Sequence, residues 1–206
     1  MHAIKVLHKL LATAVPSIHK TRLKSFIASI ESVACGAAVN VTAIGRGLTG
    51  SAYDKHKIKR ADRLLSNPHL YLERNDIYKA LTHRLLSGIT HPIIIIDWSP
   101  LCADLSQQLL RASIPVKGRS LTLYEEIHPA KKLGNRKVQH QFMDHLALLL
   151  PQGTVPTIVA DSGFRTPFYR YVEDHFGWHW VGRIRGRDFL CVDNTGEQWI
   201  SVKSFV

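Results

Sequence analysis

The chain has 206 residues, of which 45% are hydrophobic, so it can bury a substantial core in one large domain or two small ones. Its three well-separated cysteines argue against a disulfide framework or a cysteine-rich zinc site, and no apolar stretch reaches the roughly 20 residues of a membrane-spanning helix. The net charge of +11 is uneven, because residues 1–90 hold 14 Lys and Arg against 5 Asp and Glu, whereas residues 91–206 hold 13 against 11. We therefore expect a cytoplasmic globular protein in which a polyanion-binding segment precedes a region with another task; a solvated basic surface is the alternative.

The first part of the chain has the periodicity of amphipathic helices. Apolar residues recur three and four apart in the segments 4–15, 20–34 and 76–86. Between them, a short helix over 41–46 and a Gly-rich turn lead into a second helix, with Asp54 as its expected N-cap and Pro68 just past its end. The segment GRGLTGS has the glycine spacing of a phosphate-binding loop, but Ser51 stands where that loop needs lysine and no strand precedes it.

The helix that begins near residue 54 is strongly basic outside one apolar stripe. Ile58, Ala61, Leu64 and Leu65 form the stripe, and the remaining surface carries Lys55, Lys57, Lys59, Arg60 and Arg63. Helix-turn-helix modules place such a helix against the major groove and anchor it through phosphate contacts. These five basic residues are therefore predicted to contact duplex DNA.

From residue 92 onward the pattern changes to short apolar runs separated by turn residues, which is typical of strands. Strands are expected over 93–97, over 107–116 and 119–127 as a hairpin with a turn at 117–119, over the run that ends at Asp161, and over 178–186. Helices are expected over 135–151 and over 166–177, the latter with Thr166 as N-cap, Pro167 as first helical residue and Gly177 as its end.

Two aspartates end the apolar runs that we expect at the centre of the sheet. Runs continuous in apolar residues indicate burial on both faces, so the first and fourth strands belong in the middle of a mixed sheet. Three antiparallel strands, a crossover helix and a parallel strand describe a ribonuclease H-like fold. In it, Asp97 and Asp161 would meet at the carboxyl ends of adjacent parallel strands. Two carboxylates repel each other unless a cation joins them, and their oxygens suit Mg²⁺ or Mn²⁺. The alternative is that each aspartate merely begins a turn.

Other candidate chemistry is weaker. His175 and His179 are four residues apart, but Gly177 breaks any helix between them and so argues against a zinc pair. His140 and Asp144 share a helix face, which is better explained as a solvated polar surface.

The segments IKRADRLLSN, IIIIDWSPL, LRASIPVKGRSLTLYEE and IVADSGFRTPFYRYVEDHFGWHWVGRIRG resemble transposases of bacterial insertion sequences, in the insertion-sequence-4 group. The resemblance runs in order over most of residues 40–190. It implies an α/β (α+β) protein with a helical DNA-binding domain at 1–90, the first part of a ribonuclease H-like core at 91–186 and the start of a β-rich insertion at 187–206. It also implies cut-and-paste transposition by an acidic triad with Mg²⁺ or Mn²⁺, in which Asp97 and Asp161 match the two aspartates.

The family's catalytic glutamate lies in a later helix, within a Tyr, Arg, Glu, Lys signature, and the chain stops at Val206 before that signature. We therefore expect a C-terminally incomplete transposase that is inactive by itself. Glu173 is a poor substitute, because its helix should bury Phe168, Tyr171 and Val172 and leave Glu173 in water.

The resemblance also implies partners. These are the terminal inverted repeats of the element as double-stranded DNA, a second copy in a DNA-bound homodimer of the full-length protein, and association with the bacterial nucleoid. Arg183 and Arg185, which alternate along the expected fifth strand, are a second predicted phosphate contact. The alternatives are a DNA-binding protein without catalysis and a ribonuclease H-like nuclease of another family.

Overall fold

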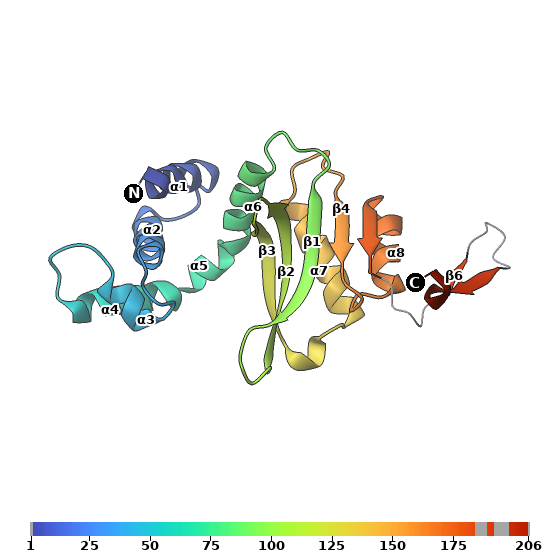
Figure 1. Cartoon of the computed structure of the whole chain (residues 1–206). Helices are drawn as coiled ribbons and strands as arrows, with labels where there is room; N and C mark the ends of the chain where they lie inside the picture. The colour runs from blue at the N-terminus through green and yellow to red at the C-terminus, as the bar shows by residue number, and fades with distance from the viewer. Residues whose placement is uncertain (1, 184–188, 192–197, 206) are drawn as a thin grey trace. The chain divides into compact units, whose positions relative to one another are not determined.

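The computed structural model describes residues 2–183, 189–191 and 198–205 and has an α/β fold (Figure 1). The chain divides into two compact units, Met1–Arg84 and Leu85–Val206. Among the described residues, no helix is both long enough and apolar enough to cross a bilayer.

The Met1–Arg84 unit is helical, as the periodicity predicts. Its helices are α1 His2–Ala14, α2 Lys20–Ala34, α3 Val41–Arg46, α4 Asp54–Leu65, α5 Pro68–Leu72 and α6 Arg74–Leu85, which ends one residue past the unit. Asn40 caps α3, because its side chain accepts a hydrogen bond of 2.8 Å from the backbone N–H of Ala43. The prediction that Asp54 caps α4 is wrong: Asp54 is the first helical residue, and Tyr53 occupies the N-cap position without a side-chain hydrogen bond.

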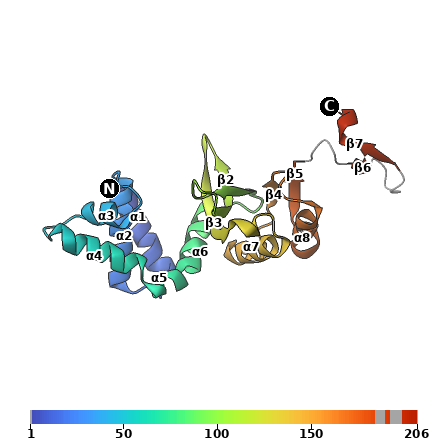
Figure 2. The same ribbon diagram turned by 90° about the horizontal axis from the view of Figure 1, so that it is seen from below.

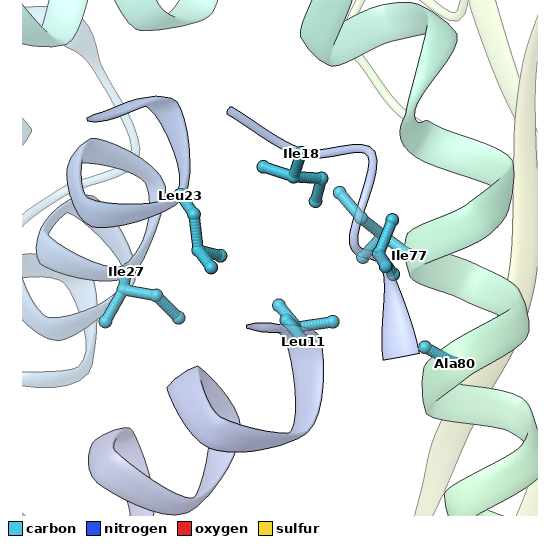
Figure 3. Close-up of a cluster of buried hydrophobic side chains, with 7 residues drawn as sticks. Leu11, Ile18, Leu23, Ile27, Ile77 and Ala80 are labelled. Carbon is cyan, nitrogen blue, oxygen red and sulfur yellow. The ribbon is translucent and has the colours of Figure 1, made fainter. Parts of the chain in front are cut away.

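The core of this unit joins α1, α2 and α6 (Figure 3). Leu11 points from α1 toward Leu23 and Ile27 of α2, and Ile77 and Ala80 of α6 close the cluster. All five are at most 9% exposed. Full burial of one Leu or Ile side chain is worth about 1.5–3 kcal/mol, so each of these residues stabilises the packing of the three helices.

The glycines at the end of α3 allow close packing with neighbouring helices. A Cβ on Gly45 would lie 2.4 Å from the Cα of Ile58, and one on Gly47 would lie 2.1 Å from Oγ of Ser32. These contacts bring α3 against α4 and α2, and the hydroxyl of Ser32 donates to the carbonyl of Ile44 at 2.9 Å. Glycine is needed at both positions because a Cβ would meet the backbone of Ile58 at Gly45 and the side chain of Ser32 at Gly47.

The second unit contains a five-stranded mixed sheet of order β3-β2-β1-β4-β5 (Figure 1). Its strands are β1 Ile93–Pro100, β2 Gln107–Val116, β3 Arg119–Pro129, β4 Thr157–Ala160 and β5 His179–Gly182. β2 is antiparallel to both β1 and β3, whereas β4 is parallel to both β1 and β5. The predicted hairpin is confirmed, with a turn of two residues, Lys117 and Gly118, since Arg119 already belongs to β3. Gly118 has a φ of 77°, which favours glycine.

Two helices, α7 Arg136–Leu149 and α8 Thr166–Phe176, lie on one face of the sheet (Figure 2). Gly177 ends α8 in the left-handed conformation, as predicted. The predicted start of α8 is wrong by one residue: Arg165 holds the N-cap position, Thr166 is the first helical residue and Pro167 the second. Proline is tolerated there because the first N–H groups of a helix have no partner within it.

Burial in β1 follows this one-sided cover. Ile94 and Ile96 are 0% and 1% exposed, whereas Ile93 is 51% exposed and Ile95 is half-buried. The central position of β1 is confirmed, but the prediction that its continuous apolar run is buried on both faces is wrong. We call the face under α7 and α8 the helix face and the opposite one, to which Ile93 and Ile95 point, the open face.

Further described elements are the 3-10 helices η1 Ala130–Lys132 and η2 Val202–Phe205 and the strands β6 Phe189–Cys191 and β7 Trp199–Ser201, which pair antiparallel.

A polar cluster lies on the helix face around Glu126, whose side chain is 13% exposed. The carboxylate accepts hydrogen bonds from the hydroxyl of Tyr124 at 2.7 Å and from the rings of His128 and His145, each at 2.8 Å. Burial alone would raise the pKa of Glu126, but these three hydrogen bonds outweigh it and hold the pKa below its ordinary value.

Candidate active site

Asp97 and Asp161 occupy equivalent places on adjacent parallel strands. Ile96 of β1 is registered with Ala160 of β4, and each aspartate is the next residue along its strand direction. Alternation along β1 puts Asp97 on the open face, two residues after Ile95. The two carboxylates that the sequence predicts to meet are therefore side by side on one face.

The turn after β4 holds Asp161 in place. Its Oδ1 accepts the backbone N–H of Gly163 at 2.8 Å, and a Cβ on Gly163 would lie only 2.9 Å from that oxygen. The hydroxyl of the buried Tyr169 reaches the carbonyls of Ala160 and Asp161, at 3.1 and 3.2 Å. A glycine and a tyrosine thus fix the end of the strand and leave the carboxylate exposed.

The two carboxylates interact electrostatically. Partial loss of hydration raises the pKa of Asp97, the charge of Asp161 raises it further, and the backbone N–H of Trp98 and the guanidinium of Arg111 oppose the rise. Burial, followed by the charge of Asp161, also raises the pKa of the Tyr169 hydroxyl to about 12. A cation between Asp97 and Asp161 would relieve this repulsion.

The aspartates belong to a row of charged residues across the open face. Arg111 of β2 is registered with both Asp97 of β1 and Glu125 of β3, and its Nε donates to Glu125 at 3.0 Å. Asp161 and Arg183 continue the row one step beyond the registered pair Ala160 and Gly182. The sequence does not single out Arg111 or Glu125, because their pairing depends on a bulge in the hairpin.

The donor set fits a hard divalent cation in part. Asp97 and Asp161 repel each other, and their carboxylates offer oxygen ligands of the kind that Mg²⁺ and Mn²⁺ prefer. Within the described ranges, no group of three or more His, Cys, Asp and Glu side chains is placed to hold a metal ion. Asp97 and Asp161 could therefore hold one ion, with the rest of its coordination from water or substrate.

The predicted DNA contacts fall into two groups. On α4, Lys57 is half-buried and the other four basic residues are exposed, namely Lys55, Lys59, Arg60 and Arg63. Arg183 is exposed, but it follows β5, which ends at Gly182, so the prediction that it alternates within a strand with Arg185 is wrong for Arg183. Arg185 lies outside the described residues.

The weaker candidates have structural partners. Glu173 is exposed on α8 and accepts the indole N–H of Trp180 at 3.0 Å. The ring of His140 stacks on Tyr171 at a centroid distance of 3.8 Å, and the Tyr171 hydroxyl donates to Asp144 at 2.5 Å. The prediction of a merely solvated surface at His140 and Asp144 is therefore wrong, because both hold α7 to α8.

No model of a protein family, no curated protein and no solved structure matches the chain.

Proposed function

We propose that the protein acts in metal-dependent cleavage and transfer of DNA strands, as a transposase with an acidic active site. The observation that carries the proposal is the pair Asp97 and Asp161, at equivalent positions on adjacent parallel strands and on an exposed face. Ligands of mixed sheets bind at the carboxyl ends of such strands, where repelling carboxylates favour a cation. A strand order with β1, β4 and β5 parallel and a β2–β3 hairpin beside β1 supports a ribonuclease H-like core.

In this proposal each residue of the charged row has a separate task. Asp97 and Asp161 would hold one Mg²⁺ or Mn²⁺ ion, and in two-metal chemistry such ions activate the attacking hydroxyl and stabilise the leaving 3′ oxygen. Arg183 lies at the exposed end of the row and contacts the phosphate next to the scissile bond. Arg111, held by Glu125, limits the negative charge that surrounds Asp97.

Two carboxylates are fewer than a two-metal site requires, because both ions must be held during the displacement. We propose that the third carboxylate is the glutamate of the resembling family, supplied from outside the described residues. With Asp97 and Asp161 as its only carboxylate ligands, the site should therefore cut DNA slowly or not at all, since loss of one metal ligand costs several orders of magnitude in rate.

A gel assay on linear DNA that carries the ends of the element tests this function. The assay compares the 206-residue chain with an extended chain that adds the family's β-rich and glutamate-bearing segments, in Mg²⁺ and in Mn²⁺. We expect the extended chain to nick at the element end and leave a 3′ hydroxyl, and its Asp97→Asn variant to be inactive. Unchanged cleavage in that variant would refute the role of Asp97. Metal-dependent cleavage by the 206-residue chain, lost on Asp97→Asn, would refute the need for a third carboxylate.

The second candidate is a DNA-binding protein without catalysis, favoured by the exposed basic residues of α4. Replacement of Lys57, Lys59, Arg60 and Arg63 by alanine should weaken duplex binding and reduce its salt dependence by about one unit of slope for each lost phosphate contact. DNA binding without cleavage by either chain would favour this candidate.

A further inference from the structure

A basic pocket of about 440 Å³ lies in the Met1–Arg84 unit, between the first turns of α2 and the second half of α4. α2 contributes Thr21, Arg22 and Ser25 to its wall, and α4 contributes Arg60 and Arg63. The residues of α2 are not among those that the sequence suggests for DNA contact. The pocket thus combines two helices that are far apart in sequence.

The arginines of the pocket differ in their partners. Arg22 is neutralised by Glu73, which it contacts through both Nε and Nη2. Arg60 donates from Nε to the hydroxyl of Ser25 at 3.0 Å, which holds its guanidinium across the gap between the helices. In the described part of the chain, no carboxylate lies within ion-pair distance of Arg60 or Arg63. Two cations therefore remain available to an anion.

Arg60 and Arg63 are three residues apart on α4, and Arg63 also follows Lys59 by four residues, so the basic side chains form one continuous surface. Of these basic residues of α4, only Arg60 and Arg63 border the pocket. Guanidinium groups bind phosphate oxygens through paired hydrogen bonds, and hydroxyl groups such as those of Thr21 and Ser25 are frequent phosphate contacts.

We propose that this pocket seats one backbone phosphate of the DNA, gripped by Arg60 and Arg63 and oriented by Ser25. The inference rests on the proposed DNA-binding role and adds the site at which the backbone is held. It assigns register and affinity to Arg60 and Arg63, which border the pocket, and leaves Lys55 and Lys59 as a general attraction for the duplex.

The test is the affinity of a labelled duplex, by fluorescence anisotropy, between about 50 and 200 mM salt. The pocket variant Arg60→Gln/Arg63→Gln is matched by Lys5→Gln/Lys9→Gln, which removes the same charge from exposed positions of α1 in the same unit. We expect the pocket variant to bind about tenfold more weakly and to lose about one unit of salt slope, and the control to change about twofold. Equal losses in both variants would overturn the proposal.

Ser25→Ala tests the geometry without a change of charge. It should weaken binding about threefold in the wild-type background and have no further effect when Arg60 is already glutamine, because its role is to hold that guanidinium. Additive losses in the two backgrounds would overturn this role of Ser25. Circular dichroism checks that all variants fold.

A second arm distinguishes the source of the phosphate. Stabilisation of the chain by about 10 mM inorganic phosphate at matched ionic strength, with no difference in DNA affinity between pocket and control variants, would assign the pocket to a free phosphate and overturn the proposal. The result is independent of strand cleavage, which depends on Asp97. Absent cleavage by the extended chain, together with the expected affinities, would refute the catalytic function and leave the pocket in place.

Discussion

Carboxylates on the two faces of the five-stranded sheet have pKa values shifted in opposite directions. On the helix face, Glu126 is more deeply buried than Asp97, yet three hydrogen bonds keep its pKa below the ordinary value. On the open face, Asp97 is exposed, yet partial loss of hydration and the nearby Asp161 raise its pKa. The comparison shows that the direction of a carboxylate's pKa shift depends more on its hydrogen-bond and charge partners than on its burial. Glu126 is satisfied within the fold, and the aspartate pair is left able to bind a cation.

The largest expected difference between carboxylates on the two faces is their effect on metal affinity. Calorimetry with Mn²⁺ should find binding to the wild type that Asp97→Asn or Asp161→Asn weakens at least about 100-fold, because each removes one of two charged oxygen ligands. Glu126→Gln, a matched neutralisation on the helix face, should change the affinity less than about twofold. Equal Mn²⁺ affinity in the wild type and both aspartate variants would show that the pair is no metal site.

The second expected difference is in how much carboxylates on the two faces contribute to the free energy of unfolding. Glu126→Gln should lower the free energy of unfolding by about 1–3 kcal/mol, because an amide replaces a carboxylate that accepts three hydrogen bonds. Glu125 is the preceding residue, and its side chain is 34% exposed and makes one ion pair, with Arg111. Glu125→Gln should therefore lower the free energy of unfolding by less than about 1 kcal/mol. Urea unfolding of both variants measures the difference. If Glu125→Gln lowered the free energy of unfolding more than Glu126→Gln does, Glu125 and not Glu126 would be the carboxylate that stabilises the fold.

The contrast between Glu125 and Glu126 also marks where prediction from the sequence ends. Periodicity locates most elements, the α/β class and the hairpin, and the expected strand arrangement places Asp97 and Asp161 at the ends of adjacent parallel strands. It does not locate the irregularity in β2–β3, where Ser113 pairs with Thr122 but Ala112 pairs with Tyr124. Because a shift of one residue moves every later side chain to the other face, this bulge decides that Glu125 meets Arg111 and that Glu126 points to α7.

Residues that work through close backbone contact are equally hard to predict. Gly45 and Gly47 look like part of a phosphate-binding loop, whereas in the structure Gly45 packs against the backbone of Ile58 and Gly47 against the side chain of Ser32. The pocket beside Arg60 requires the packing of α2 on α4, and Ser25, half-buried on α2, has no pattern that distinguishes it. In each case the role of the residue depends on tertiary contacts between segments that are distant in the sequence.

The third effect is the pH dependence of the stability that Glu126 provides. Its folded-state pKa lies below the ordinary value of 4.5, so its contribution is present above pH 4.5 and is lost as pH falls through the folded pKa. The difference in Tm between the wild type and Glu126→Gln should therefore shrink as the pH falls below about 4.5. Thermal unfolding followed by circular dichroism from pH 5 to pH 3 measures it. A difference that grows over this range would contradict the hydrogen-bonded carboxylate.

The smallest effect has the opposite sign and belongs to the open face. The folded-state pKa of Asp97 is raised above its ordinary value of 3.8, so the folded chain binds this proton more tightly than the unfolded chain does. Ionised Asp97 therefore destabilises the fold at neutral pH, and the penalty disappears as pH falls below 3.8, where the carboxyl is protonated in both states. Without metal, Asp97→Asn should raise Tm at pH 7 by about 1–2 °C, because the group is exposed and screened and its amide oxygen can still accept the N–H of Trp98. The gain should vanish at about pH 3, and Mn²⁺ should reverse it by stabilising only the wild type. A lower Tm for Asp97→Asn at pH 7 without metal would mean that Arg111 outweighs Asp161 at this carboxylate, and that the pair has no need of a cation.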